Sequence, residues 1–141
     1  MFPPKDRLTI CFAHVAYQLK ERFLRREMSV GSFEVRTPDE FERRIGEADV
    51  VVVSGLWRNH LLEHAQRLRF IQSIGAGTDQ FDRGELTERG IRLASAQGVN
   101  ARAVSEHAMA LILAMTRKLP EARDNQAKHF WRGMIPDIRQ R

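Results

Sequence analysis

Two glycines one residue apart, Gly75 and Gly77, stand in the segment FIQSIGAGTDQFD at residues 70–82. Glycine tolerates positive φ, so successive N–H groups in such a segment can converge into a concavity that binds an anion. A dinucleotide fingerprint, G-x-G-x-x-G, needs a third glycine where this chain has Gln80. The fingerprint also follows the first strand of its unit, whereas this loop follows the fourth predicted strand. We therefore expect the loop to bind a small carboxylate, and not NAD, through its backbone.

The same loop has a simpler interpretation. Asp79 and Asp82 are residues that stabilise turns and cap helices, so the segment could be only a tight connection from a strand to a helix. The composition of the loop leaves both interpretations open.

Histidines supply two further candidates. The segment HLLEH, residues 60–64, matches the H-x-x-E-H pattern of some zinc peptidases, in which two histidines on a helix face bind zinc and the glutamate acts as base. No convincing further ligand follows, so we expect no metal site. His14 comes directly after the first predicted strand, where it could face a ligand or be an ordinary turn residue.

Short β-rich segments alternate with helical patterns along the whole chain, which is typical of a parallel sheet with crossover helices. The predicted strands are 8–13, 33–36, 50–53, 70–74 and 91–94. The predicted helices are 15–27, 37–46, 59–66, 82–90, 100–119 and 120–131. These elements imply an α/β fold, a flavodoxin-like three-layer domain with a five-stranded parallel sheet, followed by a long C-terminal crossover helix.

Some of these elements carry stronger signals than others. Thr37 precedes Pro38 and Glu40, the pattern of a capped helix start, and Asp82 and Asn100 stand where caps of later helices are expected. The run 50–53 is apolar throughout, as in a strand that is buried on both faces. The pattern after the first strand places Val15, Leu19, Phe23 and Leu24 on the inner side of its helix.

Bulk composition narrows the class of protein. The 141 residues fit one domain, and 43% hydrophobic residues suffice for one core. The net charge of +5 comes without a basic–aromatic motif, so we expect no nucleic-acid partner. Cys11 is the only cysteine, and the chain shows neither a signal-peptide core nor a membrane span, so we expect a cytoplasmic protein.

Three segments together resemble one family. LRFIQSIGAGTDQFD, RGIRLASAQGVNARAVSEHAMALILAMTRKLP and HFWRG are similar to the N-terminal half of the D-isomer-specific 2-hydroxyacid dehydrogenases. The resemblance covers residues 50–133 well, and residues 1–49 in element order only. It implies a substrate-binding (catalytic) domain over residues 1–100, with residues 101–141 forming the crossover helix and a tail that stops before the dinucleotide-binding domain.

The resemblance also implies a function and a set of contacts. The family transfers a hydride between NAD or NADP and C2 of a small 2-hydroxy or 2-keto acid. The loop backbone at Ala76 and Gly77 would receive the substrate carboxylate, Trp57 would act as a lid, and Asn100 would face the substrate. The full set of implied substrate contacts is Gly55, Leu56, Trp57, Gly75, Ala76, Gly77 and Asn100.

The family's chemistry is expected to lie outside this chain. Its arginine, histidine and acid follow the start of the dinucleotide-binding region, so we assign no catalytic and no cofactor-binding residue here; His107 and Arg102 belong to the helix-start motif instead. We expect the substrate-binding half of the enzyme, inactive by itself. The alternative is a stand-alone small-anion-binding or interaction module without catalysis.

The predicted long helix has no polar side over two turns. Residues 108–115 are all apolar, and a helix that is apolar all round must be buried all round. One face can pack on the sheet, whereas the other would remain as a large exposed patch, which soluble monomers rarely carry. We therefore expect a homodimer formed through residues 104–115.

Overall fold

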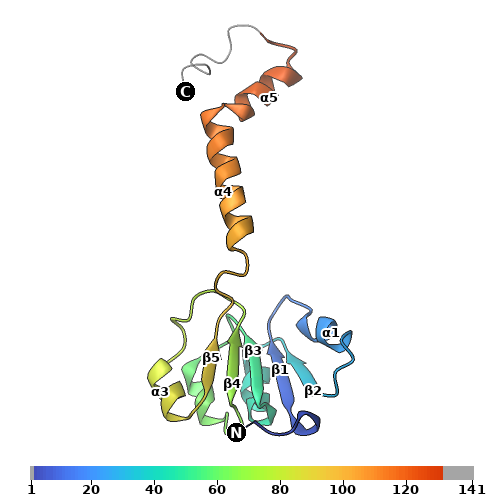
Figure 1. The fold of residues 1–141 in the computed structure, drawn as a ribbon, viewed down its shortest axis with the longest axis vertical. Helices are drawn as coiled ribbons and strands as arrows, with labels where there is room; N and C mark the ends of the chain where they lie inside the picture. The colour runs from blue at the N-terminus through green and yellow to red at the C-terminus, as the bar shows by residue number, and fades with distance from the viewer. Residues whose placement is uncertain (1, 132–141) are drawn as a thin grey trace. The chain divides into compact units, whose positions relative to one another are not determined.

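The computed structural model describes residues 2–131 and divides the chain into two compact units, one ending at Gln97 and the other beginning at Gly98. Residues 132–141, the end of the predicted tail, lie outside the described residues. The first unit contains a five-stranded sheet of order β2-β1-β3-β4-β5 in which every pair of neighbours is parallel (Figure 1). This is the flavodoxin-like strand order, so the predicted fold class is confirmed.

The elements of the first unit follow the predicted alternation. The strands are β1 (Thr9–Ala13), β2 (Gly31–Val35), β3 (Val50–Val53), β4 (Phe70–Ser73) and β5 (Arg92–Ala94). The α-helices are α1 (Leu19–Leu24), α2 (Pro38–Arg44) and α3 (Arg83–Glu88), and the 3₁₀ helices are η1 (Lys5–Arg7), η2 (Ile45–Glu47) and η3 (Asn59–Glu63).

The core lies on one face of the sheet. Cys11, Val51 and Ile71 stand side by side in the parallel register, and all three are fully buried. Side chains from the helical segments complete this cluster, among them Phe41 of α2 and Leu86 of α3. Because successive strand residues alternate between faces, one stripe of apolar residues per strand is enough to build the core.

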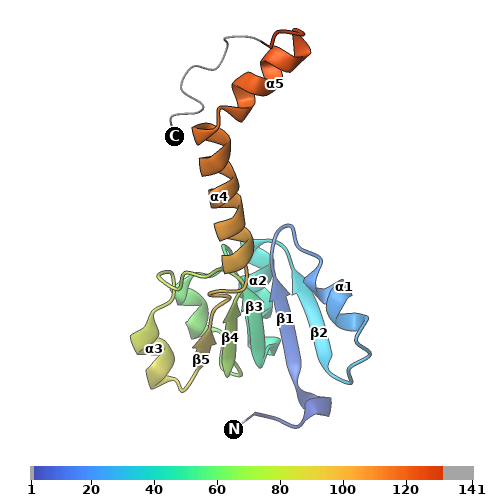
Figure 2. The ribbon, with the colours of Figure 1, turned by 45° about the horizontal axis from the view of Figure 1, so that its top comes forward.

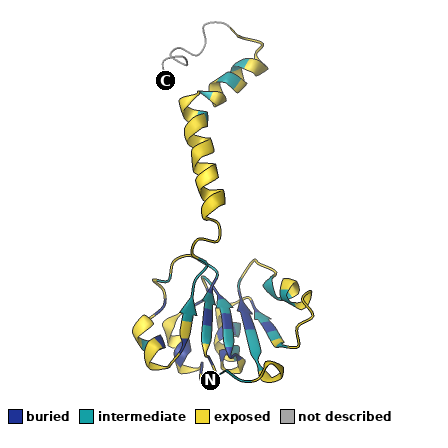
Figure 3. Cartoon of the chain, viewed as in Figure 1, coloured by how far each residue is buried: buried dark blue, intermediate teal, exposed yellow. Residues whose placement is uncertain are grey.

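The opposite face of the sheet is covered less completely. α1 lies on this face, where Phe23 contacts Phe12 with ring centroids 5.4 Å apart (Figure 2). Val50 and Val52 point to the same side and are only half-buried. Figure 3 shows both buried and half-buried segments along the strands. The expectation that β3 is buried on both faces is therefore wrong, because the described helical cover lies mainly on the core side.

Two predicted helix starts are confirmed in detail. The Thr37 hydroxyl accepts the Glu40 N–H at 3.3 Å at the start of α2, and the Asp82 carboxylate accepts the Glu85 N–H at 3.0 Å at the start of α3. Glu40 reaches back one residue further than expected, since its carboxylate accepts the Arg36 N–H at 3.1 Å. Each cap satisfies a backbone donor that has no partner within its helix.

The first predicted helix is shorter than the sequence pattern indicated. It begins at Leu19 and not at residue 15, because the His14 ring accepts the N–H groups of Ala16 and Tyr17 and holds those residues in a turn. Val15, 61% exposed, and Leu24, 55% exposed, do not face inward as expected. The helix contributes the half-buried Leu19 and Phe23 to the sheet.

The second unit consists of two helices, α4 (Ala101–Thr116) and α5 (Leu119–Ala127), which contact each other. Lys118, with φ of 53°, makes the turn between them. Among the described residues, α4 buries none of its side chains within its own unit, and the packing of one of its faces on the sheet stays a prediction. Asn100 precedes α4 but makes no side-chain capping bond, contrary to expectation.

No helix within residues 2–131 combines the length and the apolar character needed to cross a membrane.

Candidate functional site

The loops that follow the strands all leave from one edge of the sheet. Because the five strands are parallel, their carboxyl ends lie together at this edge (Figure 1). Ligands of open α/β sheets bind outside the carboxyl ends of the strands. The loops after β3 and β4 carry most of the predicted site residues and begin at this edge.

The loop after β4 is shaped by a buried serine. Ser73 is fully buried, and its hydroxyl lies 3.2 Å from the carbonyl oxygen of Gly75 and 3.5 Å from that of Gly77. The Ala96 N–H donates to the same Gly75 carbonyl at 3.1 Å. These bonds hold the carbonyl groups of the loop towards the protein.

The glycines of this loop do not have the predicted conformation. Positive φ occurs at Gly90 and Gly98 among the described glycines, but not at Gly75 or Gly77. A side chain added at Gly75 would meet Ser73 Oγ no closer than 3.7 Å. The prediction of a concavity built on positive φ is therefore wrong, since hydrogen bonds to Ser73 and not glycine conformations bend the chain.

The amide groups of this loop remain available all the same. Ala76 and Gly77 are exposed, and their N–H groups donate to no acceptor within residues 2–131. The Arg83 guanidinium lies next to the loop and donates to the Thr78 hydroxyl at 2.7 Å. Two backbone donors beside a guanidinium are suited to a carboxylate.

Acidic groups limit what this loop can hold. Asp79 lies close enough that its carboxylate would be 3.8 Å from a side-chain carbon at Gly77, and Asp82 caps α3 directly afterwards. A dinucleotide diphosphate needs a third glycine and a longer helix, whereas this loop has Gln80 and leads into six-residue α3. This loop therefore lacks the third glycine and the longer helix of a dinucleotide-binding loop.

The loop after β3 differs from expectation at its tryptophan. Gly55 is exposed, but Leu56 is 8% and Trp57 only 1% exposed. The indole packs between Phe41 and Phe81, with ring centroids 6.4 and 5.3 Å away. Trp57 is thus a core residue in this structure and not an exposed lid, because the chain folds back after the strand and buries the largest side chain.

Asn59 was not identified from the sequence. Its side-chain oxygen accepts the Trp57 Nε1–H at 3.0 Å and the Asp82 N–H at 3.0 Å. Asn59 therefore ties the loop after β3 to the start of α3 beside the glycine loop. One sequence feature could have identified Asn59: its amide side chain stands two residues after Trp57, and a buried tryptophan N–H needs an acceptor.

The remaining predicted contact and the lone thiol lie apart from these two loops in the chain. Asn100 is exposed and belongs to the second unit, so its contact with substrate stays a prediction.

Cys11 is fully buried, and burial raises the pKa of its thiol to about 12. A thiol in this state is not a nucleophile at neutral pH.

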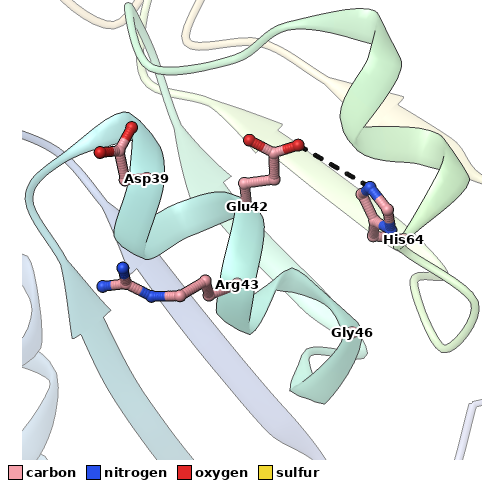
Figure 4. Close-up of a pocket in the computed structure, with 5 residues that line it drawn as sticks. All are labelled: Asp39, Glu42, Arg43, Gly46 and His64. Atoms are coloured by element: carbon pink, nitrogen blue, oxygen red, sulfur yellow. Dashed lines mark ion pairs between the residues drawn. The ribbon is translucent and has the colours of Figure 1, made fainter.

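The HLLEH histidines meet a glutamate from another helix. The Nε2 atoms of His60 and His64 lie 3.9 and 3.8 Å from Oε1 of Glu42 on α2. Glu42 and His64 line a surface hollow together with Gly46 (Figure 4). His60 lies in η3, a 3₁₀ helix that ends at His64, so the segment is not the α-helix of the zinc-peptidase pattern. Within residues 2–131, no group of three or more His, Cys, Asp or Glu side chains could hold a metal ion.

The sequence is similar to that of one enzyme family. Residues 10–132 match the model of the D-isomer specific 2-hydroxyacid dehydrogenase catalytic domain. The D-3-phosphoglycerate dehydrogenase of Methanocaldococcus jannaschii is 33% identical over 107 residues, which cover 72% of this chain and 20% of that protein. The corresponding enzyme of Archaeoglobus fulgidus is 32% identical over 95 residues, which cover 66% of this chain and 18% of that protein. The chain spans about a fifth of the length of these curated relatives.

Solved structures share the fold. A D-lactate dehydrogenase from Treponema pallidum superposes with a TM-score of 0.71 at 19% identity, over 90% of this chain and 41% of that one. A D-isomer specific 2-hydroxyacid dehydrogenase family protein from Aeromonas salmonicida gives 0.70 at 22% identity, over 89% and 41% of the two chains. Since the family model matches most of the chain, this protein belongs to the D-isomer specific 2-hydroxyacid dehydrogenase family.

Proposed function

We propose that this chain is the substrate-binding half of an NAD(P)-dependent oxidoreductase that acts on the CH–OH group of D-2-hydroxy acids and, in reverse, reduces 2-keto acids. The observation that carries the proposal is the loop after β4. Its exposed Ala76 and Gly77 have N–H groups that donate to no acceptor in the described part of the chain, whereas the carbonyl groups of Gly75 and Gly77 are held by Ser73. Membership of the family supports the same reaction class.

Each residue of the loop has a part in this proposal. The amides of Ala76 and Gly77 bind the substrate carboxylate, and Arg83 adds positive charge at Thr78. Gly55 leaves room beside them, since a side-chain carbon there would meet nothing within 4 Å. Asn100 contacts the substrate from the start of the second unit. Leu56 and Trp57 act indirectly, by packing under the loop that carries Gly55.

We propose that the cofactor and the reacting groups belong to another part of the enzyme. The relatives include an NAD-dependent formate dehydrogenase and an NADPH-dependent glyoxylate/hydroxypyruvate reductase. In the present chain, residues 1–100 would bind substrate, and residues 101–141 would lead to a dinucleotide-binding domain. The 141-residue chain is then expected neither to bind NADH tightly nor to oxidise it. We also propose a cytoplasmic location, with which the buried, unpaired Cys11 is compatible.

The binding proposal is tested by titrating the isotope-labelled 141-residue chain with D-lactate and following its backbone amides by NMR. We expect the amides of Ala76 and Gly77 to shift most. Propionate, which has the carboxylate but lacks the hydroxyl, is the matched control ligand and should bind more weakly. Absence of any response of these amides at saturating D-lactate would contradict the proposal.

The enzyme proposal is tested by NADH oxidation with glyoxylate, pyruvate and hydroxypyruvate. A form of the protein that is extended by a dinucleotide-binding domain should turn over at least one of these acids, and the 141-residue chain should not. Equal responses of the loop to D-lactate and propionate, with no turnover by the extended form, would favour a stand-alone anion-binding module instead.

We further propose that the protein forms a homodimer through residues 104–115 of α4. Apolar side chains on this helix are half-exposed or more, and the set comprises Val104, Met109, Leu111, Ile112, Leu113 and Met115. Burial of such side chains between two copies would remove their apolar surface from water. Leu113→Asp should shift the sedimentation coefficient to that of a monomer at micromolar concentration, whereas Gln126→Asp, a replacement at an exposed position of α5 outside residues 104–115, should not. A wild-type monomer would contradict the dimer.

A further inference from the structure

The strand order locates a second loop at the ligand-binding edge. In the order β2-β1-β3-β4-β5, the chain leaves β1 towards β2 on one side and leaves β3 towards β4 on the other. The loops after β1 and β3 therefore diverge, and this divergence is the switch point at which flavodoxin-like sheets bind their ligands. The proposed carboxylate loop follows β4, one strand further along.

His14 is the first residue after β1 at this switch point. Its backbone N–H donates to the Val35 carbonyl at 3.2 Å, which continues the pairing of β1 with β2. Its side chain is half-buried. An imidazole at this place is therefore held by the sheet itself and not by a flexible loop.

The orientation of the imidazole is determined by its neighbours. Nδ1 accepts the N–H groups of Ala16 and Tyr17, both at 2.9 Å. The ring also stacks on the Tyr17 ring, with centroids 4.2 Å apart and an angle of 17° between the planes. Since Nδ1 is an acceptor, a neutral His14 must carry its proton on Nε2. The residue thus presents one N–H donor in a fixed position.

The distance between the two loops suits a small organic acid. β1 and β4 are separated by β3, so their ends are two strand spacings, about 10 Å, apart. A hydroxy acid of a few carbons with a hydrogen bond at each end can span this distance. Arg36 supports the β1 loop from the other side, since its guanidinium donates to the Val15 carbonyl at 3.3 Å.

We propose that His14 is a specificity-determining residue whose Nε2–H binds the part of the acid that lies beyond its carboxylate, with Tyr17 as the positioning residue. This inference rests on the proposed function, because the glycine loop must hold the carboxylate first. His14 would then distinguish acids that carry a hydroxyl or another acceptor from those that carry only a carboxylate.

The geometric premise is tested without any ligand. A long-range ¹H–¹⁵N spectrum of the 141-residue chain under mildly alkaline conditions should show His14 with unprotonated Nδ1 and protonated Nε2. The opposite tautomer would overturn the inference.

Binding is tested with two substitutions of His14. His14→Leu removes the donor and should weaken D-lactate binding about 10-fold, the factor expected for one hydrogen bond. His14→Gln retains a side-chain N–H and should restore part of the affinity. Propionate binding should change in neither variant, and His60→Leu, the same replacement on η3, serves as the control. If His14→Leu does not fold, perturbation of the wild-type His14 Nε2 signal by D-lactate but not by propionate decides the question.

The outcomes separate the two proposals. A response of Ala76 and Gly77 to D-lactate with unchanged affinity in His14→Leu would overturn the role of His14 and leave the proposed function intact. An unchanged wild-type His14 Nε2 signal on addition of D-lactate would likewise overturn the role of His14 and leave the proposed function intact. No response at Ala76 and Gly77 in the wild type would overturn the proposed function, and the role of His14 with it.

Discussion

Replacement of Asn59 should destabilise the protein because its side-chain oxygen, Oδ1, accepts two hydrogen bonds. Asn59 Oδ1 accepts hydrogen bonds from Trp57 Nε1 and from the Asp82 backbone, each at 3.0 Å. Asn59→Ala removes the acceptor from both donors. Trp57 is 1% exposed, so its N–H loses its partner in a buried environment, which costs about 1–3 kcal/mol. The Asp82 N–H lies at the exposed start of α3 and can bind water, so its loss adds less than about 1 kcal/mol.

The expected loss in the free energy of unfolding is therefore about 1–4 kcal/mol, measured by urea denaturation and far-UV circular dichroism. Asn59→Asp is the matched control, because a carboxylate oxygen can accept the same two bonds. It should cost less than about 1 kcal/mol.

A double-mutant cycle identifies the responsible donor. In a Trp57→Phe background the indole N–H is absent. Asn59→Ala should therefore cost at least about 1 kcal/mol less in this background than in the wild type. The reasoning is refuted if Asn59→Ala is as stable as the wild type, or if its cost is the same in both backgrounds.

Three further predictions concern other single side chains. Ser73→Ala should lower the free energy of unfolding by about 1 kcal/mol and shift the amide signal of Gly77, since the hydroxyl no longer holds the loop carbonyl; an unchanged spectrum would contradict this. Thr37→Ala should cost about 1 kcal/mol in thermal unfolding and Thr37→Ser little, because only the serine keeps a cap for Glu40 N–H; equal costs would exclude the cap. The raised pKa of Cys11, about 12, stabilises the folded state fully below pH 9. That stability is lost as the pH rises towards 12, by up to about 4 kcal/mol, so the pH dependence of urea unfolding should be flatter in Cys11→Ala; parallel curves would show that the thiol does not contribute.

Elements that depend on local patterns were predicted well. The apolar run 50–53 is a strand with the predicted bounds, and Thr37 and Asp82 cap the helices that they were expected to cap. Such signals are contained in a few neighbouring residues, so the sequence is sufficient to read them. The parallel sheet and the flavodoxin-like fold class followed from the alternation of helices and strands.

Features that depend on distant partners were not predicted. The burial of Trp57 depends on Phe41 and Phe81, which are not its neighbours in the sequence. The bend at Gly77 depends on the nearby Ser73, but the sequence does not show that its hydroxyl bonds to the carbonyl groups of the loop. Asn59 was overlooked for the same reason, because one of its two donors comes from the loop before α3. The substrate contacts expected at Gly55, Gly75, Ala76, Gly77 and Asn100 stay predictions.

The sheet topology also affects how the chain folds. β1 pairs through Ile10 with Ser32 of β2 and with Val50 of β3, and no two strands form a hairpin. Every ladder therefore requires closure of a long loop before its first contact forms, which slows folding relative to a helical bundle of the same size. During synthesis, β1 must wait for β3 before both of its edges are paired. Until then, its apolar residues and an unpaired edge are open to contacts with other nascent chains, so a low rate of translation is expected to increase the demand for chaperones.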